Sequence, residues 1–294
     1  MKLNDDQVMQ FKLFGFVLIP DLFSPNEMGT LQSEFLYAAK RNEAEAGVFD
    51  NSVTHTFSML GNDTPLYSSL LEDSRFYGPA SQLFGTDVFG LETNGYRYIE
   101  NTPWHFNDGA PNVHGYGPKY QFPVFESVTP ETGALRFIPG SHKESWQKEL
   151  TQWWPLASGS SRSPEAVAIL DRIPSVAIAA KPGDVVLFDM RLVHATYGGS
   201  SDRRMSAVTY YHYPETPEEL EVMRITAKEF YKSPTRWNKV QWDEWFSDPH
   251  GSPLRQSWIN TWERLAKTPQ SATGLCLDYD SYETTGYAAF KSLS

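Results

Sequence analysis

The residues best suited to metal chemistry are two histidines far apart in the chain and a carboxylate close to the first. His105 lies in the segment 102–109, TPWHFNDG, which also contains Asp108. His194 comes much later, behind the apolar run at 185–188. Two imidazoles and one carboxylate on one side of an iron(II) ion form a facial triad with open coordination positions. A single β-turn cannot supply three convergent ligands, so a local pair plus a distant histidine fits this site.

A pair of arginines, Arg203 and Arg204, follows His194 in a stretch that reads as a strand. A guanidinium is permanently charged and binds a carboxylate through two parallel hydrogen bonds. Neighbouring residues of a strand point to opposite faces, so only one of the two can face a site. We predict that it is Arg204, because the small Ser206 on the same face leaves room for a ligand.

These residues together resemble the phytanoyl-CoA dioxygenase family of iron(II)/2-oxoglutarate oxygenases. The resemblance runs from about Asp5 to Tyr213. Its motifs are Trp104-His105, the segment 132–142 (TGALRFIPGSH), Pro182-Gly183-Asp184, and His194-Ala195-Thr196 with Arg204. Each motif alone is weak, and their combination is specific.

The resemblance implies a hydroxylase that uses Fe(II), 2-oxoglutarate and O2 and releases succinate and CO2. It points to His105 and His194 as metal ligands, with Asp108 as the carboxylate that we favour for the third position, and it assigns the far end of 2-oxoglutarate to Arg204 and Thr196. The expected substrate is a small-molecule metabolite or a natural-product intermediate. The lack of a basic patch argues against a CoA thioester or a nucleotide.

One departure concerns the carboxylate ligand. The family writes its first ligand pair as His-x-Asp, whereas this chain has Asn107 at that place and Asp108 one residue later. Either a one-residue β-bulge brings Asp108 to the metal, which we favour, or Asn107 holds the position and leaves it to water or chloride. The second alternative predicts halogenation or another altered outcome. A third alternative is a non-catalytic barrel that binds a ligand or a partner subunit.

The surrounding pattern predicts a mainly β fold with flanking helices, a double-stranded β-helix or jelly-roll barrel. In such a barrel, residues from distant strands meet at one mouth. We expect a single domain over 1–294, with a helical N-terminal segment (about 1–41), an insertion (about 146–174) and a Trp-rich C-terminal extension (about 216–294). Expected helices cover 4–13, a stretch from Ser24, 73–84 and a stretch from Thr216. Expected strands cover 16–20, 88–91, 96–99, 120–125, 134–138, 176–179, 184–188 and 205–211.

The composition of the chain limits the kinds of binding partner that we expect. The formal charge is -11 and no Lys/Arg block is present, so we expect neither nucleic acid nor an anionic membrane as a partner. The lone Cys276 fits a reducing compartment, and neither a signal peptide nor a membrane-spanning run is visible. We therefore expect a cytoplasmic protein, whose Trp-rich extension packs on the barrel or forms a homodimer surface. Candidates for the cavity wall are Tyr98, Trp104, Phe106, Tyr116 and Tyr120, whereas His142 is expected to be structural.

Overall fold

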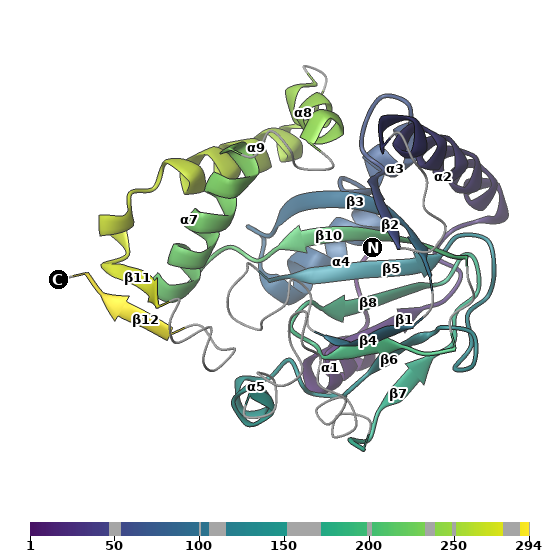
Figure 1. Ribbon diagram of the computed structural model, residues 1–294, viewed down its shortest axis with the longest axis horizontal. Helices are drawn as coiled ribbons and strands as arrows, with labels where there is room; N and C mark the ends of the chain where they lie inside the picture. The colour runs from purple at the N-terminus through teal and green to yellow at the C-terminus, as the bar shows by residue number, and fades with distance from the viewer. Residues whose placement is uncertain are drawn as a thin grey trace.

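Two antiparallel β-sheets face each other in the computed structural model of the chain (Figure 1). The structure describes residues 1–46, 54–99, 101–105, 116–151, 172–198, 202–232, 239–248, 251–278 and 289–293. The two facing sheets and the helices around them confirm the predicted jelly-roll barrel with flanking helices. Asn107, Asp108 and most of the insertion predicted over 146–174 lie outside the described residues.

The larger sheet has six strands in the order β1-β8-β5-β10-β3-β2. Its central strand β10 pairs along one edge with β3 and along the other with β5. Alternate residues of this sheet point into the barrel and toward the helices that cover its outer face. The strands are β1 (Phe16–Ile19), β2 (His55–Ser58), β3 (Phe89–Tyr98), β5 (Pro118–Pro123), β8 (Val185–Asp189) and β10 (Arg203–Tyr211).

The prediction of two strands over 88–99 was wrong, because β3 is one continuous strand. The polar run Glu92-Thr93-Asn94-Gly95 looks like a turn, yet all four residues pair with β10, and Asn94 and Gly95 also pair with β2. Thr93 and Asn94 are buried there. Gly95 leaves room for the Phe57 ring, since a Cβ at this position would lie 2.4 Å from it.

The smaller sheet has four strands in the order β4-β9-β6-β7 and closes the barrel. Aromatic side chains from both sheets fill the space between them. Phe16 of the larger sheet stacks on Phe137 of the smaller one, with ring centroids 4.9 Å apart, and Phe137 also packs against Phe188. The strands are β4 (Thr102–His105), β6 (Leu135–Phe137), β7 (Val176–Ile178) and β9 (His194–Thr196).

Helices of the first third of the chain cover the outer face of the larger sheet (Figure 1). Asn4 and Gln7 form a capping box at the start of α1, and Ser24 and Glu27 exchange the same type of bonds at the start of α2. The apolar residues of α2 that lie on one face are buried, namely Met28, Leu31, Phe35 and Ala38. The helices are α1 (Asp5–Phe14), α2 (Pro25–Ala46), α3 (Pro65–Leu70) and α4 (Ser74–Phe84).

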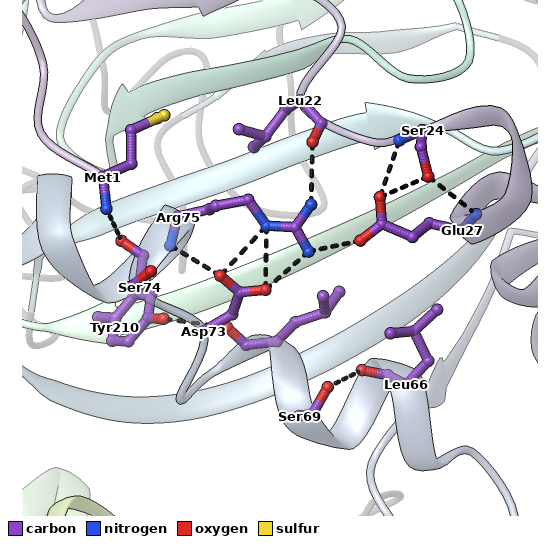
Figure 2. A network of polar contacts seen from close by, with 11 residues as sticks. Met1, Leu22, Ser24, Glu27, Leu66, Ser69, Asp73, Ser74, Arg75 and Tyr210 are labelled. Carbon is purple, nitrogen blue, oxygen red and sulfur yellow. Dashed lines mark hydrogen bonds and ion pairs between the residues drawn. The ribbon is translucent and has the colours of Figure 1, made fainter.

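Arg75, at the start of α4, joins these helices to the barrel (Figure 2). Its guanidinium bonds the Asp73 carboxylate at 2.7 Å and the Glu27 carboxylate of α2 at 2.7 Å. It also donates to the carbonyl of Leu22, in the connection after β1, at 3.0 Å. The hydrogen bond from Arg75 lowers the pKa of Glu27 from 4.5 to about 2. One side chain thus connects two helix N-termini and a strand exit.

The C-terminal extension packs on the barrel through its tryptophans. Trp262 is completely buried and donates its indole N–H to the carbonyl of Gly90 in β3 at 3.1 Å. Trp258 lies against the same glycine, where a Cβ would be 2.7 Å from its ring. No helix in the described parts of the chain is long and apolar enough to cross a membrane. Helix α5 (Glu144–Thr151) lies in the insertion. The elements that follow the barrel are α7 (Pro217–Lys232), α8 (Lys239–Ser247), α9 (Pro253–Lys267), β11 (Leu275–Asp278) and β12 (Ala289–Ser292).

Candidate metal and co-substrate site

His105 and His194 face each other across two adjacent strands of the smaller sheet. Their ring centroids are 4.1 Å apart. Thr102 of β4 pairs with Thr196 of β9, but three residues later His105 pairs with His194, only two residues back along β9. The extra residue in β4 is a bulge at Pro103-Trp104, and it re-aims His105 to stand opposite His194. Without the bulge, the regular antiparallel register would pair His194 with Trp104 instead of His105.

Backbone carbonyls fix the orientation of both imidazoles. His105 Nδ1 lies 2.8 Å from the carbonyl oxygen of Pro103, and His194 Nδ1 lies 2.8 Å from that of Leu192. A carbonyl only accepts, so each Nδ1 carries the proton and the lone pair is on Nε2. Burial holds the pKa of His194 well below its ordinary value, and the adjacent His105 lowers it further. Neutral imidazoles with the lone pair on Nε2 are the form that binds iron(II).

The residue predicted as the third ligand, Asp108, lies outside the described residues. The described parts of the chain contain no group of three His, Cys, Asp or Glu side chains that could hold a metal, and both Asn107 and Asp108 fall in the segment 106–115. The only irregularity in the described part of β4 precedes His105. The two described histidines suit an imidazole-plus-carboxylate metal centre by type and tautomer.

Arg203 lines the same cavity as the two histidines. Its Nη2 donates to the Thr196 hydroxyl at 2.9 Å, and its Nη1 is buried with no partner among the described residues. The guanidinium lies over the Tyr98 ring, 4.7 Å from its centroid. Gly133 permits this position, because a Cβ there would stand 2.0 Å from Nη1. A buried guanidinium with an unused N–H beside a hydroxyl is suited to a carboxylate.

Thr196 completes this end of the cavity. Its hydroxyl oxygen accepts from the backbone N–H of Thr102 at 3.1 Å and from Arg203. Both lone pairs of the hydroxyl are then occupied, and its proton remains to be donated. The role of Thr196 as a hydroxyl partner for the co-substrate stays a prediction; the structure places its hydroxyl beside the Arg203 guanidinium.

Arg204 does not face the cavity, so the prediction that it is the inward-facing arginine was wrong. Its guanidinium forms an ion pair with Glu126 and lies 4.0 Å from the centroid of the Phe125 ring. Ser206, on the same face, bonds the Tyr67 hydroxyl beneath the outer helices at 2.8 Å. The alternation of the strand was predicted correctly, but the inward face carries Arg203.

The other predicted wall residues are distributed differently. Tyr98 lines the cavity, whereas Tyr120 points outward and donates to the carbonyl of Phe76. Trp104 is buried on the opposite side of β4, against Tyr197, and Tyr116 lines a separate crevice. Phe106 is outside the described residues. His142 is buried against Gly15 rather than beside the metal histidines, as a structural residue would be.

Lys119 is a cavity residue that was not singled out from the sequence. Its ammonium group lies 5.4 Å from the centroid of the Tyr96 ring. The usable signal was the alternation in β5, where Lys119 and Gln121 share one face while Tyr120 and Phe122 share the other. A lysine on one face of an otherwise buried strand indicates a polar interior.

The sequence was compared with models of known protein families. A sequence model of the phytanoyl-CoA dioxygenase (PhyH) family matches residues 11–206. The chain belongs to the phytanoyl-CoA dioxygenase family. Its members are oxygenases that use iron(II), 2-oxoglutarate and O2, so this chain is an oxygenase of that class.

Curated relatives extend the comparison beyond the family level. An ectoine dioxygenase of Bordetella bronchiseptica is 24% identical over 220 residues, covering 66% of this chain and 70% of the relative. One from Sphingopyxis alaskensis is 26% identical over 223 residues, covering 65% and 70%. A 2-aminoethylphosphonate dioxygenase from an uncultured bacterium is 28% identical over 160 residues, covering 52% and 57%.

Solved structures share the fold. HygX from Streptomyces hygroscopicus, crystallised with nickel and 2-oxoglutarate, superposes with a TM-score of 0.56 at 20% identity, covering 72% of this chain and 88% of HygX. EctD from S. alaskensis, crystallised with 2-oxoglutarate and 5-hydroxyectoine, gives a TM-score of 0.55 at 21% identity, covering 74% and 79%. At these identities the likeness establishes the jelly-roll oxygenase fold.

Proposed function

We propose that this protein hydroxylates a small molecule, with iron(II) bound by His105, His194 and Asp108 and with 2-oxoglutarate anchored by Arg203 and Thr196. The observation that carries the proposal is the combination of two backbone-oriented imidazoles with a buried guanidinium in one cavity. A metal that takes nitrogen ligands and a dicarboxylate that takes a cation both find suitable groups there.

Each residue has a distinct part in this proposal. His105 and His194 offer Nε2 to the metal, while their Nδ1–H groups stay bonded to carbonyls. Arg203 supplies its open Nη1 and Thr196 its hydroxyl proton to the distal carboxylate of 2-oxoglutarate. When bound, iron with 2-oxoglutarate and O2 supplies the oxidising step, and the co-substrate leaves as succinate and CO2. The protein orients the reactants and keeps water away.

The substrate is proposed to be a small metabolite or a natural-product intermediate. The curated relatives are named for ectoine and for 2-aminoethylphosphonate, both small molecules. Identities of 24–28% to these relatives support the reaction type.

The test combines metal binding with co-substrate turnover. We expect the protein to bind one iron(II) per chain under anaerobic conditions, and His105→Ala or His194→Ala to abolish that binding. Arg203→Met should keep iron and weaken 2-oxoglutarate binding, whereas Arg204→Met, which loses a partly exposed ion pair, should change neither. Full iron binding by both histidine variants would place the metal elsewhere.

The identity of the third ligand has its own test. If Asp108 binds the metal, Asp108→Ala should lose iron affinity and succinate production, and Asn107→Ala should keep most of both. A second candidate function, halogenation, follows from Asn107 standing where the family has Asp. It predicts an active Asp108→Ala variant, chloride in the product of the parent, and hydroxylation in Asn107→Asp. Succinate, iron content and product are measured with and without chloride.

A further inference from the structure

Buried polar atoms without a hydrogen-bond partner gather inside the barrel. Among the described residues, five buried side-chain atoms have no partner, and three of them belong to one face of β3 and β10, namely Asn94 Oδ1, Arg203 Nη1 and Thr209 Oγ1. An unpaired buried donor or acceptor costs free energy, so such an atom indicates that a partner is missing. The distal carboxylate of 2-oxoglutarate is the proposed partner of Arg203. The proposed function gives no partner to Asn94 or Thr209.

Asn94 and Thr209 lie on the inner face of the larger sheet. Ala207 pairs with Asn94, and Ala207 belongs to the apolar cluster between the two sheets. Residues two apart in a strand share a face, so Thr209 faces the same interior. Asn94 is 1% exposed and Thr209 2%. Diagonal neighbours on adjacent strands stand about 7–8 Å apart, a gap that one group of a ligand can bridge.

Thr209 stands at the metal end of the barrel. It pairs with Lys119 of β5, which pairs in turn with Phe188 of β8. The Phe188 ring packs against the ring of His194, with centroids 5.3 Å apart. Arg203 lies at the other end of the same face, roughly 20 Å back along β10. A co-substrate held between Arg203 and the histidines therefore leaves the Thr209 end of the barrel to the substrate.

The two side chains offer neutral hydrogen bonds. The Asn94 amide nitrogen donates to the Tyr96 hydroxyl at 3.4 Å, which leaves the other end of the amide for a ligand. The Thr209 hydroxyl can donate and accept. Lys119 and Glu92 flank Thr209 in the sheet and have opposite formal charges, so they add no net charge. Burying a charged ligand group against two neutral side chains is costly, whereas a neutral group that donates and accepts satisfies both.

We propose that Asn94 and Thr209 bind the primary substrate through a neutral hydrogen-bonding group, a hydroxyl or a carboxamide. The proposal rests on the proposed function, because it names the substrate class of the same site. These two residues select the substrate, whereas His105, His194 and Arg203 serve the metal and the co-substrate.

The stability of the substrate-free protein gives the first test. Thr209→Val replaces a hydroxyl that no described protein group bonds with a methyl of similar shape, so the midpoint of thermal unfolding should stay or rise. Thr64→Val is the matched control, because the fully buried Thr64 hydroxyl donates to the Met59 carbonyl at 2.7 Å. Its midpoint should fall by about 2–4 °C, for the loss of one hydrogen bond. A similar fall in Thr209→Val would show that its hydroxyl already has a protein partner, which would overturn the proposal.

Binding of four probes gives the second test. Cyclohexanol, cyclohexanecarboxamide, cyclohexanecarboxylate and cyclohexylamine share one ring and differ in the hydroxyl, amide, anionic or cationic group. The protein is loaded with 2-oxoglutarate and manganese(II), which speeds the magnetic relaxation of probe protons that bind near it. The same protein with zinc(II) is the blank. Titration of each probe gives its dissociation constant, and 2-oxoglutarate affinity is measured by calorimetry on the same samples.

We expect cyclohexanol or the carboxamide to bind at least about tenfold more tightly than either charged probe, and the tighter of the two identifies the neutral group. Thr209→Val and Asn94→Leu should each weaken that probe by about threefold to tenfold, the range of one neutral hydrogen bond. Their affinity for 2-oxoglutarate should match that of the parent. Thr209→Ser keeps the hydroxyl and should retain the probe, and it remains informative if Asn94→Leu fails to fold.

Tighter binding of a charged probe would overturn the neutral substrate class. Parent-like binding of the neutral probe by both Thr209→Val and Asn94→Leu, or no binding of either neutral probe to the parent, would overturn the assignment of these residues. Failure of the parent to bind 2-oxoglutarate is a separate result, and it would refute the proposed function itself.

Discussion

Arg203 differs from the other buried arginines in the described part of the chain by its lack of a carboxylate partner. Arg224 is paired with Glu221, and Arg255 with Glu72 and Asp248. Burial lowers the pKa of Arg203, because desolvation costs free energy for the charged guanidinium. An anionic ligand relieves that cost, so its binding should also stabilise the folded protein.

Gly133→Ala tests the space that Arg203 needs. A methyl group would lie 2.0 Å from Nη1, and Gly133 has φ of +92°, which other residues rarely adopt. We expect the variant to lose 2-oxoglutarate affinity while still binding iron, since the guanidinium must move and the histidines need not. Calorimetry with each ligand measures this. Gly29→Ala is the matched control, because no atom lies within 4 Å of its Cβ. Parent-like 2-oxoglutarate binding by Gly133→Ala would contradict the packing argument.

The residue types of the site were readable from the sequence, and their directions were not. His105 can be recognised from one local motif, and His194 and Thr196 from another. The choice between Arg203 and Arg204 depends on which face of β10 meets the smaller sheet, and alternation alone is symmetric in that respect. Lys119 escaped notice because nothing local distinguishes it from a solvated lysine. Its place in the cavity wall depends on the position of β5 inside the larger sheet.

At the scale of elements, helix starts were predicted well because their signals are local. The bonds of Asn4, Ser24 and Thr216 to residues three positions later are all present. The bulge at Pro103-Trp104 was not predicted, because a bulge is defined by the partner strand, which lies far away in sequence. The predicted bulge after His105 stays a prediction, since it falls outside the described residues.

Arg75→Met should uncouple α2 and α4 from the exit of β1. Arg75 contacts two carboxylates and a carbonyl at once, so we expect a loss of more than about 1 kcal/mol, the upper range of isolated exposed pairs. The free energy of unfolding, measured in urea, checks this. Lys267→Met, which breaks a single exposed helix pair, should change it little.

The Arg75 effect should depend on pH. Glu27 has its pKa lowered from 4.5 to about 2 in the folded state, so the stability from this contact is present above 4.5. It is lost as the pH falls through about 2, when the carboxylate takes up a proton. The stability difference between the parent and Arg75→Met should therefore narrow over that range. A constant difference would show that Glu27 does not contribute.

At the scale of the whole molecule, the C-terminal extension shares the hydrophobic core that lies between the larger sheet and its outer helices. Trp258 and Trp262 belong to the same buried cluster as Phe89 of β3, and Trp245 donates to the carbonyl of Ser68 at 2.9 Å. The sequence indicated an aromatic-rich tail that packs on the barrel or forms a dimer surface. The buried tryptophans show that the tail packs on the barrel. Composition alone could not predict this, because packing on the barrel and forming a dimer surface would use the same residues.

Trp262→Ala should destabilise the whole protein, not only the extension. It removes a fully buried ring and the bond to Gly90, for which we expect a loss of about 3–5 kcal/mol. Thermal unfolding followed by circular dichroism should show one transition at lower temperature. Trp146→Ala, on the 41% exposed ring of α5, is the control and should change little. A separate early transition in Trp262→Ala, with the barrel unaffected, would contradict a shared core.

The carbonyl acceptors of His105 and His194 have a consequence for how this protein diverges. Every residue type carries a backbone carbonyl, so mutations of Pro103 or Leu192 leave the acceptor atoms in place. Substitutions of side chains in the cavity wall can therefore accumulate without changing the atoms that orient the two histidines. New substrates can evolve by exchange of wall residues such as Gln121 and Met205. A laboratory library restricted to those two positions should retain iron in most of its members and vary mainly in the compounds they accept.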